Sequence, residues 1–147
     1  MARHGIEELI IKNWYGEPVM FPTQLYSRRE LKHLVLHVCA MATLEYFHGF
    51  PNLLSLELIH VNFLSGTVWD FIAGCPSLES LKMNRPSTNE MRLRDIANVR
   101  NLRKLDLRFG LYNVVTTITT SDIFHLKRLQ NLETLTLDFS DCTVRTI

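Results

Sequence analysis

The chain has 147 residues, of which 46% are hydrophobic, so its length and composition fit one folded domain. Sixteen Lys and Arg against fifteen Asp and Glu give a net charge of +1, which favours neither nucleic acid nor a membrane surface as a partner. No stretch approaches the roughly 18 apolar residues of a membrane span, and three cysteines without a C-x-x-C spacing do not indicate an oxidising compartment. We therefore expect an intracellular protein, cytoplasmic or nuclear.

One spacing of aliphatic residues, L-x-x-L-x-L, recurs along the chain. Its six copies begin at Ile6, Leu31, Leu53, Leu78, Leu102 and Leu132. The intervals are 25, 22, 25, 24 and 30 residues, and the first four fall in the window of roughly 20 to 29 residues that is typical of leucine-rich repeats. All 18 template positions are aliphatic or Met, an agreement that chance would give about once in a million trials. We predict an α/β leucine-rich-repeat solenoid of about six coils, forming a single domain over residues 1–147.

Each copy of the pattern predicts a short parallel strand. Side chains alternate between the two faces of a strand, so the aliphatic residues point into the solenoid and the residues between them line a concave sheet. The central concave column is then Ile10, Val35, Glu57, Lys82, Asp106 and Thr136, and the next column is Lys12, His37, Ile59, Asn84, Arg108 and Asp138.

The convex connections are expected to be helical or irregular. Pro18 and Pro22 indicate an extended return segment, because proline lacks a backbone donor. Thr67 and Gly74 are typical of the start and stop of a helix. Residues 83–89 resemble a loop, residues 91–99 and 121–129 have helical spacing, and residues 110–120 are a β-branched insertion. Seven aromatic residues are expected to pack in the convex interior: Trp14, Tyr15, Phe47, Phe50, Phe63, Trp69 and Phe71.

Several segments go beyond a generic repeat and resemble the plant F-box/leucine-rich-repeat proteins, especially those that also carry an FBD domain. The segments are FHGFPNLLSLEL at residues 47–58, IAGCPSLESL at 72–81, GIEEL at 5–9 and LKHLVLHVC at 31–39. The resemblance is strong over residues 5–81 and weaker as far as Cys142. It covers the repeat region only, with neither an F-box nor an FBD segment in this sequence.

In that family an F-box docks onto a cullin-type ubiquitin ligase through a small adaptor, and the repeats are thought to present a substrate protein. The resemblance therefore implies substrate recognition, with the cullin-ligase adaptor as a partner only if an F-box lies upstream. A fragment, a truncated gene product and a stand-alone interaction scaffold stay open. A second alternative is a repeat fragment of a plant nucleotide-binding immune receptor.

The sequence offers no catalytic, metal or cofactor site, and we expect no enzyme and no cofactor. His33 and His37 lie four apart, which on a strand is about 13 Å, too far for one metal ion. Cys39 and Cys75 have no basic partner fixed by the pattern, so they are interpreted as structural thiols. No glycine-rich phosphate loop or nucleophile elbow occurs.

The concave columns are the candidate protein-binding site. Adjacent strands lie about 4.8 Å apart, so Glu57, Lys82 and Asp106 should form a ladder of alternating charge. We predict that a protein partner binds there through six residues: Glu57, Lys82, Asp106, Arg108, His37 and Ile59. The alternative is a solvated face whose charges satisfy one another. The strand at residues 6–11 has no preceding coil, so self-association through this edge is also expected.

Overall fold

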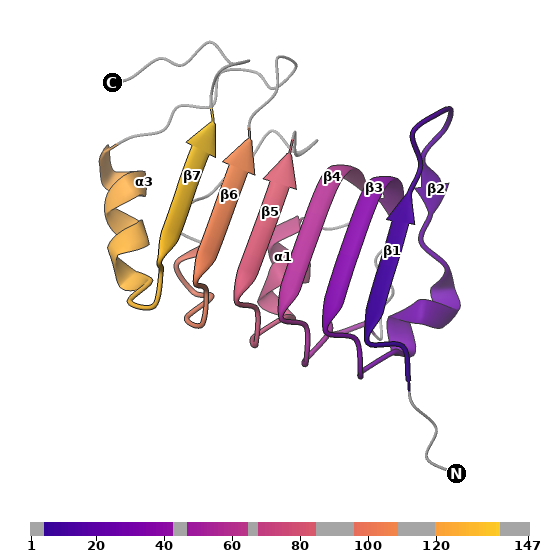
Figure 1. Ribbon diagram of the computed structural model, residues 1–147, viewed down its shortest axis with the longest axis horizontal. Coiled ribbons are helices and arrows are strands. Elements are labelled where there is room, and N and C mark those ends of the chain that lie inside the picture. The colour runs from indigo at the N-terminus through magenta and orange to yellow at the C-terminus, as the bar shows by residue number, and fades with distance from the viewer. Residues whose placement is uncertain (1–4, 43–46, 65–67, 85–95, 109–119, 139–147) are drawn as a thin grey trace.

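The computed structural model describes residues 5–42, 47–64, 68–84, 96–108 and 120–138. They form a seven-stranded parallel sheet in the order β1-β3-β4-β5-β6-β7, with β2 also paired to β3 (Figure 1). The strands are β1 (Glu8–Lys12), β2 (Val19–Met20), β3 (His33–Met41), β4 (Ser55–Phe63), β5 (Ser80–Asn84), β6 (Lys104–Arg108) and β7 (Thr134–Asp138). The predicted solenoid with a parallel sheet is confirmed.

The strands stack in register on their aliphatic residues. Leu34, Leu56, Leu81 and Leu105 are successive partners across four strands, and each is almost completely buried. Because side chains alternate along a strand, this register also fixes the concave columns, and both predicted columns match the observed partners from β1 to β7. We call the sheet face opposite helix α1 the concave face.

The two long strands change their alternation at one equivalent position. Val38 in β3 and His60 in β4 have φ of 55° and 52°, a left-handed conformation that is uncommon for residues with a Cβ. Their neighbours Cys39 and Val61 are register partners and are buried. The left-handed residue thus lets each strand point a third apolar side chain into the core. This side chain is Cys39, three residues after Leu36, in β3 and Val61, three residues after Leu58, in β4.

The convex side carries short helical pieces: η1 (Thr23–Ser27), α1 (Val68–Ala73), α3 (Thr120–His125) and η2 (Leu126–Arg128). Figure 1 shows α1 behind the strands. The helix expected after Thr67 is confirmed as α1, and the helix expected over residues 121–129 is confirmed as α3 and η2. The extended segment around Pro18 is confirmed as β2, whereas η1 was not predicted.

Other expectations about the connections are changed or lie outside the described residues. The loop predicted over residues 83–89 begins too early, because Met83 and Asn84 still belong to β5. Residues 85–95 and 109–119, which hold most of the predicted helix at 91–99 and of the insertion at 110–120, lie outside the described part of the chain. The assignment of residues 1–147 to a single domain stays a prediction.

Five of the seven aromatic residues pack inside as expected. Phe47, Phe50 and Phe71 form a cluster with ring centroids 5.0 to 6.0 Å apart, and Phe63 and Trp69 also contribute to the core. The expectation is wrong for two others, because Trp14 is 64% exposed and Tyr15 is 91% exposed. Both follow the end of β1, at the edge of the sheet, where no further described coil packs against them.

Neighbouring coils are joined by a recurring side-chain hydrogen bond just before four of the six repeat starts, those at Leu53, Leu78, Leu102 and Leu132. Asn52 donates to the Arg29 carbonyl, Ser77 to that of Pro51, Asn101 to that of Pro76 and Asn131 to that of Arg100, over 2.8 to 3.3 Å. Each bond satisfies a turn carbonyl of the preceding coil. The turns are thereby held at the same spacing as the strands.

Two glycines allow close backbone contact between two coils. Gly49 has a φ of +94°, and a Cβ added to it would collide with the backbone of Gly74. A Cβ on Gly74 would in turn collide with the His48 carbonyl. Glycine therefore serves packing at both positions, and at Gly49 it also suits the left-handed backbone.

We expect Gly49→Ala to destabilise the fold by several kcal/mol, because it combines a left-handed alanine with a backbone collision. Gly16→Ala is the matched control. Gly16 also has a positive φ, of +86°, but a Cβ there would meet nothing within 4 Å. Gly16→Ala should lower the free energy of unfolding by only about 1 kcal/mol. Urea unfolding measures the free energy of unfolding of both variants. An equal loss of stability in the two variants would contradict the close backbone contact between Gly49 and Gly74.

Candidate functional site

One carboxylate on the concave face connects side chains of three neighbouring strands. The Oε1 atom of Glu57, on β4, lies 3.1 Å from the Nζ atom of Lys82 on β5. Its Oε2 atom lies 3.1 Å from the Nε2 atom of His37 on β3. Lys82 is the register partner of Glu57 on β5, and Val35 is its register partner on β3. His37 lies two residues beyond Val35 and is therefore a diagonal neighbour of Glu57. We call these three residues the His37–Glu57–Lys82 cluster.

The cluster holds Glu57 in its charged form. Burial raises the pKa of this carboxyl group, but the hydrogen bonds from His37 and Lys82, together with their charges, outweigh that effect. The pKa of Glu57 consequently lies below its ordinary value of 4.5. At neutral pH the cluster therefore presents a fixed carboxylate and, beside it, a Lys82 side chain that is 40% exposed.

His37 is the buried member of the cluster, with only 5% of its surface exposed. Its Nε2 atom donates to Glu57, since an ionised carboxylate can only accept. Its Nδ1 atom is buried and has no hydrogen-bond partner in the described part of the chain. The Trp14 ring packs edge-on against the imidazole, with the centroids 5.2 Å apart. Buried polar atoms without partners cost free energy, so this arrangement depends on close packing around the ring.

The predicted ladder of alternating charges is only half right. Glu57 and Lys82 do pair, but Lys82 is directed to Glu57 and the Oδ1 atom of Asp106 instead lies 3.5 Å from the Nε atom of Arg108. Asp106 and Arg108 lie two residues apart on β6 and so share one face. Arg108 reaches Asp106 along its own strand, an arrangement that the column pattern does not specify.

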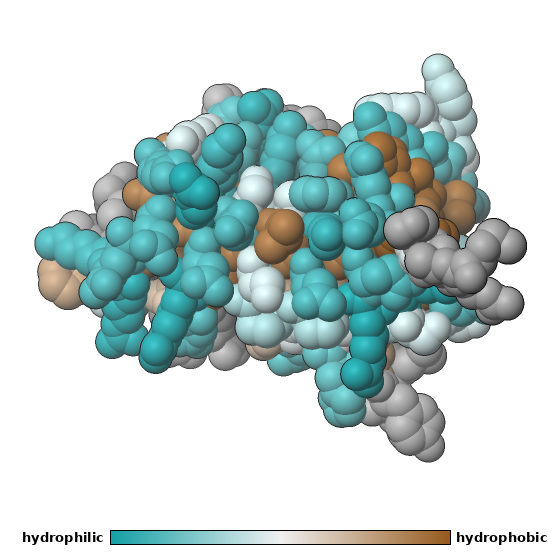
Figure 2. Space-filling model, turned by 60° about the horizontal axis from the view of Figure 1, so that its bottom comes forward, coloured by the Kyte–Doolittle hydropathy of each residue, from teal (hydrophilic) through white to brown (hydrophobic). Residues whose placement is uncertain are grey.

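Apolar side chains flank the cluster toward the N-terminal strands. Ile59 is the register partner of His37 and is half-buried, and Val35 and Ile10 continue the central column toward β1. Ile10 is 51% exposed. Figure 2 shows hydrophobic colour gathered at the β1 end of the molecule, with mainly hydrophilic residues and a smaller hydrophobic group over the middle. The concave face therefore has an apolar part and a charged part.

Sequence reasoning missed Trp14 as part of this face. The signal was present, because Trp14 continues the alternation of Glu8, Ile10 and Lys12, which all lie on the concave face. Of the six predicted site residues, the structure joins His37, Glu57 and Lys82 directly and places Ile59 next to them. Asp106 and Arg108 form a separate pair one strand further on. A role for the six residues in binding stays a prediction.

The described residues do not otherwise suggest reactive chemistry. Cys39 and Cys75 are buried free thiols, and burial raises the pKa of both, to about 11 for Cys75. A buried thiol that stays protonated is a poor nucleophile. Within the described ranges, no group of three His, Cys, Asp or Glu side chains is arranged to hold a metal ion. Nor does any described helix combine the length and apolar character needed to cross a membrane.

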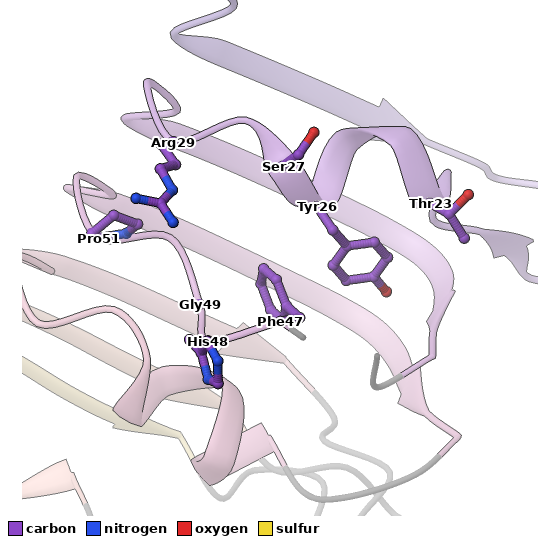
Figure 3. Close-up of a pocket in the computed structure, with 8 residues that line it drawn as sticks. All are labelled: Thr23, Tyr26, Ser27, Arg29, Phe47, His48, Gly49 and Pro51. Carbon is purple, nitrogen blue, oxygen red and sulfur yellow. The ribbon is translucent and has the colours of Figure 1, made fainter. Parts of the chain in front are cut away.

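A pocket of about 510 Å³ lies on the convex side, between η1 and the segment that leads to β4 (Figure 3). Tyr26 and Phe47 contact edge-to-face in it, with centroids 4.7 Å apart. The Tyr26 hydroxyl already donates to the Ala42 carbonyl, at 2.7 Å. Arg29 and His48 are exposed at its sides, and none of the described residues that line it is acidic. This depression between coils lacks the bonded polar cluster that distinguishes the concave face.

Comparison with protein families identifies the repeats. A family model described as "FBD-associated F-box protein At5g56370, LRR repeats" matches residues 1–147. The chain belongs to this family. The resemblance inferred from the repeat segments is thus confirmed, for the repeat region.

Two curated relatives of this F-box/FBD/LRR repeat family come from Arabidopsis thaliana. F-box/FBD/LRR-repeat protein At1g13570 is 34% identical over 84 residues, which are 57% of this chain and 20% of that protein. F-box/FBD/LRR-repeat protein At3g26920 is 29% identical over 108 residues, which are 73% of this chain and 25% of that protein. The chain therefore spans about a fifth to a quarter of the length of these relatives. The immune-receptor alternative finds no support in these matches.

A solved structure supports the fold independently. The structure of Leptospira interrogans LRR protein LIC12759 aligns with 94% of this chain and 36% of its own, with a TM-score of 0.55. The two sequences are 23% identical, so this similarity concerns the fold alone. A leucine-rich-repeat sheet of this form is therefore not specific to the F-box/FBD/LRR family.

The His37–Glu57–Lys82 cluster predicts a pH-dependent stability. The pKa of Glu57 is lowered in the fold, so its carboxylate stabilises the protein above its ordinary pKa of 4.5, and this contribution is lost as the pH falls through the lower folded value. Glu57→Gln should cost about 1–2 kcal/mol at neutral pH. The difference from wild type should shrink below about pH 4.5.

Urea unfolding from about pH 7 to about pH 3 measures this effect. Glu7→Gln is the control, because it removes an exposed ion pair with Lys32. It should change stability by less than about 1 kcal/mol. If Glu57→Gln lowers the free energy of unfolding equally at every pH, the charge of the Glu57 carboxylate does not stabilise the fold as proposed.

Proposed function

We propose that this chain is a non-enzymatic protein-binding module and that it is the substrate-recognition repeat region of an F-box-type ubiquitin-ligase receptor. Its membership of the F-box/FBD/LRR repeat family supports the second part. The relatives are named for an F-box and an FBD as well as for repeats. In such a protein the F-box would recruit the ligase adaptor, and the repeats would hold the substrate.

The observation that carries the proposal is the His37–Glu57–Lys82 cluster beside apolar side chains on one continuous sheet face. Its charges are held in place by hydrogen bonds at 3.1 Å, so a partner would not have to order them on binding. Ile59 and Val35 offer apolar surface next to it. Protein interfaces commonly combine such an apolar part with polar groups that set orientation.

The size of the face also suits a protein rather than a small molecule. Register pairing continues over six strands, from β1 to β7, so the columns form a broad surface. A stable protein interface needs about 800 Å² on each partner. The exposed cations Lys82 and Arg108 at the charged part favour a partner that carries acidic residues opposite them.

The double substitution Lys82→Glu with Arg108→Glu tests the site. It reverses both concave cations, so a partner that is bound in plant extract should be retained at least about tenfold less. Quantitative mass spectrometry of proteins captured by the wild type and the variant measures the loss. Circular dichroism and melting curves must show that the variant is folded, and Lys82→Ala with Arg108→Ala replaces it if repulsion from Glu57 prevents folding.

Arg100→Glu with Arg128→Glu is the matched control. Both arginines are exposed and precede their strands, and the change in net charge is the same. Partners should be retained by this control and lost by the concave variant. Loss with both variants would indicate a non-specific charge effect. If partners still bind the Lys82→Glu, Arg108→Glu variant but no longer bind when residues 110–120 are deleted, the binding site lies on that segment.

The ligase role has its own test. The longest transcript that includes this chain should encode an F-box upstream, and its product should copurify with a cullin and its adaptor. The isolated 147-residue chain should bind the substrate without them. If the product carries an F-box but does not copurify with a cullin and its adaptor, the ligase role is contradicted. The proposal that the repeats bind a protein would be unaffected.

A further inference from the structure

Exposed apolar side chains are concentrated on β1, β2 and the segments that flank β1. β1 is the outermost strand of the sheet that the structure describes, and no described strand pairs with its outer side. Of the nine large hydrophobic residues that are exposed in the described part of the chain, six belong to residues 6–20: Ile6, Ile10, Trp14, Tyr15, Val19 and Met20. Figure 2 shows this apolar region at the β1 end. An open strand edge with apolar side chains is a template for pairing with another strand.

We propose that two copies of this chain pair through β1, antiparallel and related by a two-fold axis at Ile10. In such a pair, residues whose numbers add to 20 lie opposite one another. The unpaired backbone groups of both edges would then form hydrogen bonds, and the two sheets would join into one. A two-fold interface uses the same surface on both copies, so β1 must be complementary to itself.

The concave side chains of β1 meet this condition. Ile10 would lie opposite Ile10 of the second copy, and Glu8 would lie opposite the second copy's Lys12. One step beyond the strand, the exposed Ile6 would lie opposite the exposed Trp14 of the second copy. Every pair therefore joins apolar to apolar or acid to base, the combinations that stabilise neighbouring strands.

The other face of β1 is complementary as well. Leu9 and Ile11 are partly buried and pack against the core from its end. In the antiparallel pair, Leu9 would lie opposite Ile11 of the second copy, and Ile11 would lie opposite Leu9 of the second copy. The two cores would then continue into one another, and apolar surface that β1 leaves in solvent would be buried.

A head-to-tail arrangement, in which β1 pairs with β7 of another copy in continuation of the solenoid, fits less well. Extending the parallel register would place Lys12 beside Asp138, an acid–base pair, but it would also place Ile10 beside Thr136 and Glu8 beside Thr134 of the neighbour. The last two pairs match an exposed apolar residue and a carboxylate to hydroxyl groups. The head-to-tail arrangement would also leave free ends and grow into a filament. The antiparallel pair closes after two copies.

Charge reversal at Glu8 and Lys12 tests the pairing and its direction. Glu8→Lys sets like charges opposite Lys12 of the second copy, and Lys12→Glu does the same opposite Glu8, so each variant should dimerise at least about tenfold more weakly than the wild type. An equimolar mixture of the two variants should restore association, because only the mixed pair brings opposite charges together. The double variant Glu8→Lys with Lys12→Glu should also dimerise like the wild type.

Sedimentation equilibrium of the 147-residue chain measures these dissociation constants. Circular dichroism of each variant checks that the fold is kept, and the mixture rescues association only if both single variants are folded. A wild-type chain that stays monomeric at high concentration would overturn the proposal. So would weak single variants that fail to associate in the mixture, or wild-type species that grow beyond dimers, which would favour head-to-tail pairing.

Discussion

The structure depends on one constraint: successive strands must stack in the register that aligns their leucines. Leu56 is buried only because Leu34 and Leu81 lie on either side of it, so no coil completes its interior alone. A shift by one residue would turn the leucines outward and the concave residues inward. The hydrogen bonds from Asn52, Ser77 and their equivalents hold the turns to the same repeat. The register that builds the core thus also arranges the concave face.

This explains why much of the fold could be predicted. The period-two alternation specifies which residues pair, and both concave columns follow from it without any knowledge of side-chain geometry. What the pattern cannot specify is the choice between partners at similar distances. Glu57 can reach both His37 and Lys82, and Asp106 is reached by Arg108 along its own strand. These choices depend on rotamers and burial, which the spacing of leucines does not encode.

The ends of the solenoid were harder to predict for a related reason. A repeat pattern assumes a neighbour on each side. Trp14 and Tyr15 were assigned to the convex interior with the other aromatic residues because no aromatic residue recurs in the concave columns. β1 has no described neighbour on its outer side, and these residues follow it into the exposed segment before β2. The left-handed residues Val38 and His60 were also missed, since neither is of a type that favours this conformation as glycine does.

Separation of core and surface positions gives such a repeat protein freedom to change its binding face without loss of stability, because column residues such as Ile59 and Arg108 add little to the core. His37 is an exception. It belongs to a concave column, yet it is buried between Trp14 and Glu57 with its Nδ1 atom unpaired. A change at this position would alter packing and would also release the carboxylate of Glu57, so stability and recognition are coupled there. The concave face can vary most freely toward β6 and β7, and least around His37.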